Sequence, residues 1–183
     1  MLNPYPQDGT ELRENLRVID EVLTELYFDL ELVPGMGAVG SGAAFVADVT
    51  TGIGSVEFPN AGTPLWIVQK LRRDRWRRGR LRITTTYTAT VGSTANFRLT
   101  IRLRETQGGD VYPTTALLDV SRVIPGPAVA YTEMKDVYVS PGIVMPGTKP
   151  NLNIILLRAT ANAADVNANS LHVVSQLWEI LPA

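Results

Sequence analysis

The sequence predicts a mainly β protein, an antiparallel β-sandwich of the jelly-roll type preceded by an N-terminal α-helix. From Ser55 onward, short apolar stretches recur between turns rich in Pro and Gly. Many short strands with such turns are typical of sandwiches and barrels. Two of these stretches, 81–89 and 97–103, alternate apolar and polar residues. This alternation predicts half-buried antiparallel strands, which we expect to form a hairpin around the polar link 91–96.

The first segment is predicted to be an amphipathic helix. Asp8 and Glu11 have the spacing of a capping box, and Pro34 and Gly35 are expected to end the helix. Between them, apolar residues recur at alternating spacings of 4 and 3, at positions Leu12, Leu16, Ile19, Leu23, Leu26 and Leu30. Two interpretations follow from this heptad pattern: the helix packs on its own domain, or copies of the chain join through a short parallel coiled coil, as a homotrimer.

The composition changes along the chain and predicts three parts. Residues 1–34 form the helix, 35–54 a Gly-rich connector, and 55–183 the sandwich. The connector is apolar for a linker, so we expect it to lie along a protein surface. Within the sandwich, the stretch 152–157 is apolar at nearly every position, which predicts a central strand covered on both faces.

Composition excludes several classes of protein. The 183 residues are 45% hydrophobic and carry a net charge of −1, which is typical of a folded protein and gives no overall case for nucleic acid. There is no cysteine, which rules out disulfides and thiolate zinc sites. No apolar run is long enough for a transmembrane helix, so no membrane partner is expected. The N-terminus lacks the pattern of a secretory signal, so we expect synthesis in a cytoplasm.

Catalysis has little support in the sequence. His172 is the single histidine and lies in a predicted strand, where a structural role is favoured. The carboxylates outside the N-terminal segment are scattered singly. We therefore expect no enzyme, no catalytic residue, no metal and no cofactor. Asp165 is interpreted as a loop residue that binds backbone N–H groups or Arg158, and Trp66 and Trp178 as packing residues.

Residues 70–82 form a basic cluster. Its arginines include Arg72, Arg73, Arg75, Arg77, Arg78 and Arg80. Arginine favours paired hydrogen bonds to carboxylates, so docking to a partner protein is the favoured interpretation. Binding of nucleic acid through arginines around Trp76, and a solvated loop without a function, are the alternatives.

Several features in order resemble the jelly-roll domains of tailed-bacteriophage virion proteins, which occur in capsid decoration proteins, head fibres and tail fibres. They are Trp-Arg-Arg-Gly-Arg-Leu at 76–81, the two alternating strands, the stretch 157–165 and a final strand at 171–180. In that family an Arg and an Asp flank the loop between the last two strands. The resemblance implies a non-enzymatic, trimeric virion protein that binds and decorates or stabilises a capsid or tail lattice. Its implied partners are major capsid or tail proteins, and its implied location is the virion.

Two other functions remain open. The chain could be a receptor- or glycan-binding fibre module, with its exposed aromatic residues on loops at an end of the sandwich. It could also be an internal scaffold whose arginines contact packaged genome, in which case binding would fall steeply with salt. Assembly predicts exposed apolar residues on the helix and the connector instead.

Overall fold

A computed structural model describes residues 9–26, 29–47, 52, 54–72, 79–110, 116–142, 144 and 148–181. One helix, α1 (Gly9–Leu26), precedes the strands in these ranges. The strands are β1 (Asp29–Leu32), β2 (Ala38–Gly40), β3 (Ala44–Ala47), β4 (Gly54–Phe58), β5 (Leu65–Arg72), β6 (Arg80–Thr88), β7 (Asn96–Thr106), β8 (Ala116–Pro125), β9 (Met134–Val139), β10 (Asn151–Arg158) and β11 (Leu171–Leu181).

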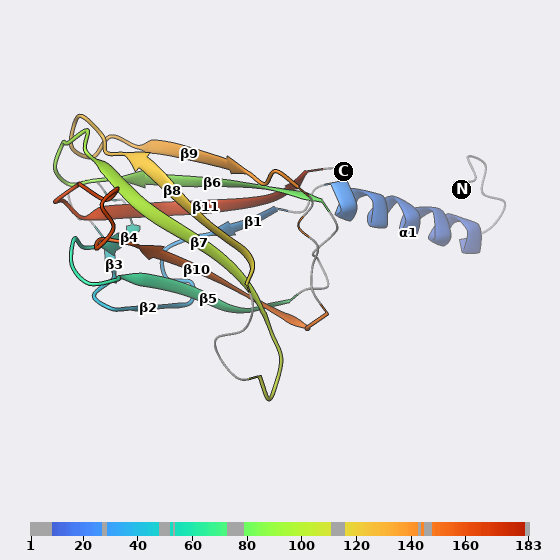
Figure 1. Cartoon of the computed structure of the whole chain (residues 1–183). Helices are drawn as coiled ribbons and strands as arrows, with labels where there is room; N and C mark the ends of the chain where they lie inside the picture. The colour runs from blue at the N-terminus through green and yellow to red at the C-terminus, as the bar shows by residue number, and fades with distance from the viewer. Residues whose placement is uncertain are drawn as a thin grey trace.

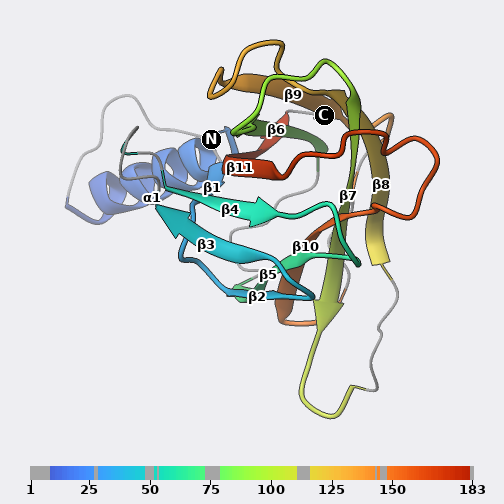
Figure 2. The same ribbon diagram turned by 90° about the vertical axis from the view of Figure 1, so that its left-hand side faces the viewer.

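The strands form two antiparallel sheets that face each other (Figures 1 and 2). Sheet A has the order β3-β4-β11-β6-β9, with β1 also paired to β11, and sheet B has the order β2-β5-β10-β7-β8. From β4 onward the chain crosses from one sheet to the other at every link except that between β7 and β8, so that β4, β11, β6 and β9 face β5, β10, β7 and β8. This is the strand order of a jelly roll, so the predicted fold class is confirmed.

The predicted hairpin is wrong, although both of its strands exist. β6 pairs with β11 and β9 in sheet A, whereas β7 pairs with β10 and β8 in sheet B. The link between them therefore crosses from one sheet to the other. Alternation shows that each strand has one buried face, but both sheets of a sandwich satisfy that pattern equally.

The sandwich also begins earlier than the sequence predicts. The helix ends at Leu26, and Leu30 lies in β1 opposite Trp178, partly buried against the core. Its apolar side chain is therefore used by the sandwich, not by a helical seam. The expected connector contributes β2 and β3 to the sheet edges. Gly37 has a φ of 76°, and a Cβ there would lie 2.1 Å from the carbonyl oxygen of Ile67, so glycine allows the turn into β2 to approach β5.

Both sheets bury a tryptophan in the shared core, as the sequence predicts. Trp66 of β5 and Trp178 of β11 are fully buried. Each indole N–H has an acceptor: Trp66 donates to the carbonyl of Met36, and Trp178 donates to Gln176 Oε1 at 2.8 Å. Gln176 in turn donates to Thr85 Oγ1 at 2.9 Å. These bonds satisfy polar groups that would otherwise destabilise the core.

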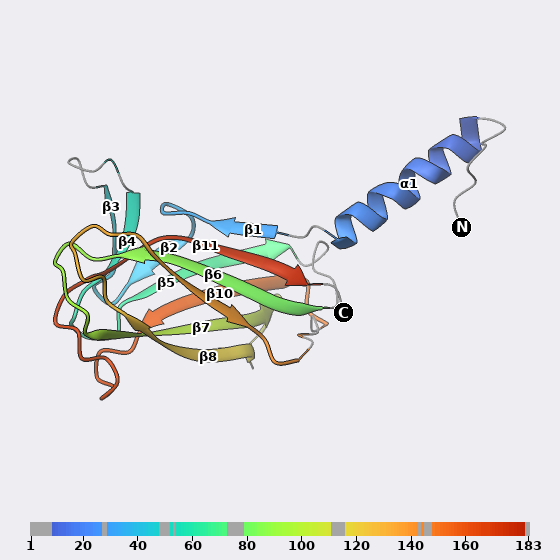
Figure 3. The same cartoon turned by 90° about the horizontal axis from the view of Figure 1, so that it is seen from above.

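α1 lies beyond the end of the sandwich at which β1 begins (Figures 1 and 3). No helix within the described ranges is long and apolar enough to cross a membrane. The same end of the sandwich carries the end of β5, the start of β6 and the loop between β7 and β8. The candidate site described next lies at this end.

Candidate functional site

The outer face of sheet B presents polar and aliphatic side chains in ordered rows, because alternate residues of each strand point away from the core. We call it the sheet B face. The register places Leu65 beside Leu157, Ile67 beside Ile155, and Asn153 beside Arg104. The face comprises Leu65, Ile67 and Gln69 of β5, Asn151, Asn153, Ile155 and Leu157 of β10, Thr100, Arg102, Arg104 and Thr106 of β7, and Asp119 and Ser121 of β8.

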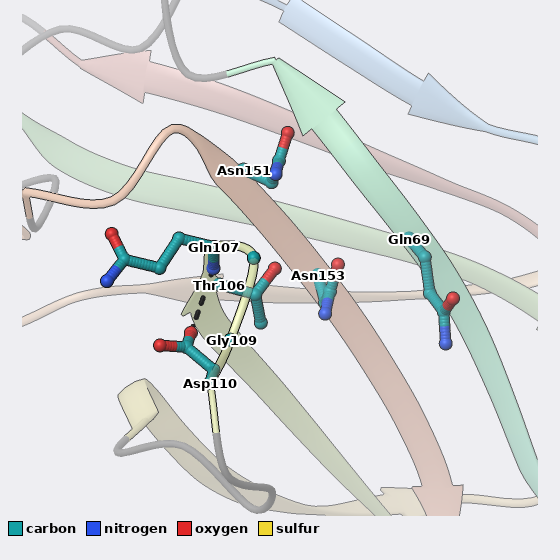
Figure 4. A pocket seen from close by; sticks show the side chains of 8 residues that line it. Gln69, Thr106, Gln107, Gly109, Asp110, Asn151 and Asn153 are labelled. Atoms are coloured by element: carbon teal, nitrogen blue, oxygen red, sulfur yellow. Dashed lines mark hydrogen bonds between the residues drawn. The ribbon is translucent and has the colours of Figure 1, made fainter.

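A pocket of about 300 Å³ lies at the end of this face that is nearest the loop between β7 and β8 (Figure 4). Apart from two glycines, its lining residues carry amide, hydroxyl or carboxylate side chains. The lining residues are Gln69, Thr106, Gln107, Gly108, Gly109, Asp110, Asn151 and Asn153. This volume is at the lower end of the range for small-ligand sites.

The central strand β10 places two of the pocket amides. Asn151 and Asn153 are two residues apart, so both point to the same side of the sheet. The pairing of β10 with β5 shifts register between Leu152 and Ile154. Asn153 therefore lies at an irregular point, or bulge, in the pairing of these two strands. Gln69, near the end of β5, completes the row and is exposed. Bulges commonly redirect a side chain beside a binding site.

The other wall of the pocket is a turn held by a carboxylate. Asp110 Oδ2 accepts a hydrogen bond from the backbone N–H of Gln107 at 2.8 Å, and its Oδ1 forms an ion pair with Lys149 Nζ at 2.8 Å. The Lys149 ammonium group and the Gln107 N–H hold the pKa of Asp110 below its usual value. Lys149 also donates its backbone N–H to Glu105 Oε2 at 3.1 Å. The turn is thereby fixed to the segment that enters β10.

Away from the pocket, the sheet B face becomes amphipathic. The aliphatic side chains of β5 and β10 are half-buried and form a strip along the middle of the face. Beside it, Arg102 and Asp119 form an ion pair at 2.8 Å. Thr100 and Ser121 hydroxyls lie 2.8 Å apart in the next row. Polar groups thus border an apolar strip that continues into a polar pocket.

This arrangement suits a neutral ligand with several hydroxyl groups and an apolar face. The exposed Gln69 and the half-buried Asn151 each have an amide with two donors and an acceptor, so each can donate a hydrogen bond to one ligand hydroxyl and accept one from another. The aliphatic strip offers a surface for C–H groups. Within the described ranges, no group of three or more His, Asp or Glu side chains lies close enough to hold a metal ion.

The structure separates the predicted seam residues. Leu12, Leu16 and Ile19 are exposed on α1, and Leu30 belongs to β1. Leu23 and Leu26 lie in the helix, but their side chains fall outside the described residues. The seam therefore spans the helix alone and ends at Leu26.

Most of the predicted basic cluster lies outside the described residues. Those not described are Arg73, Arg75, Arg77 and Arg78. Arg80 is exposed at the start of β6. The backbone of Arg72 pairs with that of Asn151, a pocket residue. Both termini of the basic cluster thus lie at the same end of the sandwich as the pocket.

His172 has a structural environment, as the sequence predicts. It is buried on β11, and its Nδ1 lies 3.1 Å from the Ser55 hydroxyl oxygen of β4. The interpretation of Asp165 is also confirmed. Its carboxylate binds the Arg158 guanidinium and accepts the backbone N–H of Arg98 at 3.0 Å.

Sequence reasoning missed the pocket residues. The amides Asn151 and Asn153 interrupt the start of an apolar central strand, and this is the signal that could have found them. Two polar residues at a spacing of 2 on such a strand lie on the same face of the sheet and indicate that this face is polar at that end of the strand. Gln69 and Asp110 have no comparable pattern, because only the pairing of β5, β10 and β7 brings them near.

No model of a known protein family matches the chain, and no curated protein matches it. Solved structures do share its fold. An exo-β-1,3-galactanase from Phanerochaete chrysosporium, solved with β-1,3-galactotriose, matches with a TM-score of 0.51 and 10% identity, over 82% of this chain and 29% of that one. The Agl-KA catalytic domain matches with a TM-score of 0.50 and 13% identity, over 85% and 28%.

A carbohydrate-binding module, CBM35 from Cellvibrio japonicus Abf62, matches with a TM-score of 0.49 and 16% identity, over 82% of this chain and 92% of that one. At such identities the likeness is one of fold. The strand order of the two sheets places the chain in the class of jelly-roll β-sandwiches.

Proposed function

We propose that this chain is a non-catalytic glycan-binding module and that the sheet B face is its binding site. The observation that carries the proposal is the pocket lined by Gln69, Asn151, Asn153 and Asp110, continuous with the aliphatic strip. Sugars present hydroxyl groups around an apolar ring face, and the site offers partners for both.

The fold gives a second, weaker support, because the galactanase that shares it was solved with β-1,3-galactotriose. Function resides in the site and not in the fold. The pocket residues are therefore the part of the argument that experiment must test.

The test is a glycan array probed with the full-length chain, followed by calorimetry with the glycan that binds. Gln69→Ala removes an exposed pocket amide, and we expect it to weaken binding about tenfold, the effect of one well-placed hydrogen bond. Asn96→Ala is the matched control, because it removes an exposed amide at the start of β7, the end of that strand opposite the pocket. An array without binding, or equal effects of the two substitutions, would contradict the proposal.

The role in a phage virion stays a prediction that rests on the sequence resemblance, and docking through the basic cluster stays a prediction that rests on its arginines. Among the possible roles in a virion, the sheet B face favours that of a glycan-binding module on a fibre. Detection of the chain by mass spectrometry in purified virions would support it, and its absence from them would refute it.

A further inference from the structure

α1 exposes an apolar stripe that no other described part of the chain covers. Leu12, Leu16 and Ile19 are 49%, 56% and 43% exposed. The helix lies beyond the strand ends, away from both sheets (Figures 1 and 3). Large apolar side chains exposed in one line along a helix indicate a surface for another helix.

An isolated helix of this kind is only marginally stable. α1 has 18 residues, and its local support includes an exposed ion pair between Arg17 and Glu14 at 2.5 Å. Such surface pairs contribute little, and helices in water obtain most of their stability from packing of an apolar face. A partner is therefore needed for α1 to persist as a helix.

The pattern of the stripe identifies the partner as the same helix. With Leu16 and Leu23 at heptad position a, and Leu12, Ile19 and Leu26 at position d, the stripe repeats every 3.5 residues on average. The glutamates of α1 then fall at positions c and f, away from the seam: Glu11, Glu14, Glu21 and Glu25. Arg13 and Asp20 fall at position e, beside the seam, so the a and d positions themselves carry no charge. Such an uncharged a/d seam is self-complementary.

We propose that α1 joins three copies of this chain in a parallel coiled coil. β-Branched residues at a with Leu at d favour dimers, and this seam instead has Leu at both of its a positions, with Leu12, Ile19 and Leu26 at d. Val22 at position g makes the apolar stripe wider than the a/d seam that a two-helix coiled coil buries. A closed three-fold assembly requires parallel helices, because each copy must contact the next in the same way.

The coil would place three sandwiches at one end of the same stem. If the proposed function holds, three weak glycan sites then act together, and their joint affinity for a multivalent surface exceeds that of one site by about 10²–10⁴-fold. The coil itself does not depend on glycan binding, so its test is separate from that of the sheet B face.

The test is light scattering coupled to size exclusion on the full-length chain. We expect a mass near three times 20.0 kDa. Ile19→Glu places a charge in the centre of the seam and should give a mass of 20.0 kDa, because three carboxylates would meet in an apolar core. Thr10→Glu adds the same charge at position b, off the seam, and should leave the trimer intact.

Near-UV circular dichroism of the buried tryptophans checks that the Ile19→Glu sandwich is folded. A wild-type monomer or dimer would overturn the proposal. So would an Ile19→Glu protein that remains a trimer, or dissociation by Thr10→Glu to the same extent.

Discussion

Arg158 and Asp165 form a fully buried, two-bonded ion pair across the loop that joins β10 to β11. Arg158 Nε donates to Asp165 Oδ2 at 2.9 Å, and Nη2 donates to Oδ1 at 2.7 Å. The remaining guanidinium protons reach the backbone carbonyls of Phe58, Asn167 and Asn169. The Arg158 Cζ also lies 4.9 Å from the centre of the Phe97 ring. One side chain thus fastens the loop to both sheets.

Replacing Arg158 should destabilise the protein strongly. Arg158→Met leaves the Asp165 carboxylate and several carbonyls buried without their donor, which should cost about 3–5 kcal/mol. Arg17→Met is the matched control, because Arg17 pairs with Glu14 on the exposed face of α1 and should cost about 0–1 kcal/mol. Urea unfolding at one fixed protein concentration measures both. Equal losses would show that the buried pair has no special role.

Stability should fall at high pH because of Tyr87. Its ring is buried, its hydroxyl donates to the carbonyl of Pro125 at 2.9 Å, and burial, with a smaller effect of Asp136, raises its pKa to about 12. Above about pH 10 the unfolded chain releases this proton while the folded chain keeps it, so unfolding is favoured as pH rises from about 10 to 12.

Urea midpoints at about pH 8 and about pH 11 measure this effect. Tyr87→Phe should be less stable at the lower pH by about 0.5–1.5 kcal/mol, since it loses the hydrogen bond, but should show a smaller fall at the higher pH. The same fall in both proteins would rule Tyr87 out as its source.

Substitution of Tyr131 should increase the stability of the protein, whereas substitution of Arg158 should decrease it. Its φ of 60° is unusual for a residue with a large side chain, while the side chain is 42% exposed. Tyr131→Asn suits the left-handed backbone and should raise stability by about 1 kcal/mol. Val129→Asn, an exposed residue in the same loop, should change it by less than about 0.5 kcal/mol. Thermal midpoints compare the two, and a lower midpoint for Tyr131→Asn would contradict the strain.

Substitutions of Gly37 and Gly35 distinguish the cost of backbone strain from the cost of a steric clash. Both have positive φ, but a Cβ at Gly37 would meet the Ile67 carbonyl, whereas a Cβ at Gly35 would meet open space. Gly35→Ala should therefore cost about 1–2 kcal/mol from strain alone. Gly37→Ala should cost more, because it also pushes β2 away from β5. Equal losses in urea unfolding would mean that β2 adapts freely.

Much of the fold could be predicted because the relevant patterns are local. Alternation in β6 and β7, the apolar run of β10 and the turns between strands follow from neighbouring residues. The sheet to which β6 and β7 belong could not be predicted, because pairing is set by contacts between distant segments. Leu30 shows the same limit: its spacing fits the helical seam, but β11 offers it a strand partner and a core.

The candidate site was less predictable than the fold. Arg158 and Asp165 are close in sequence and have complementary charges, so their pairing could be anticipated. Gln69, Asp110 and Asn153 come from three separate parts of the chain, and only the order of sheet B brings them to one pocket. Gln69 and Asp110 carry no signal in isolation, since single polar residues are common on any surface.

The most direct test of glycan binding by the sheet B face is a methyl NMR titration of the full-length chain with the glycan that binds on the array. The methyl signals of Ile67 and Ile155 should shift with glycan concentration. The signal of Ile124, which is buried near the end of β8 that lies farther from the pocket, should stay in place. Shifts confined to residues outside the sheet B face, or no shifts at saturation, would contradict it.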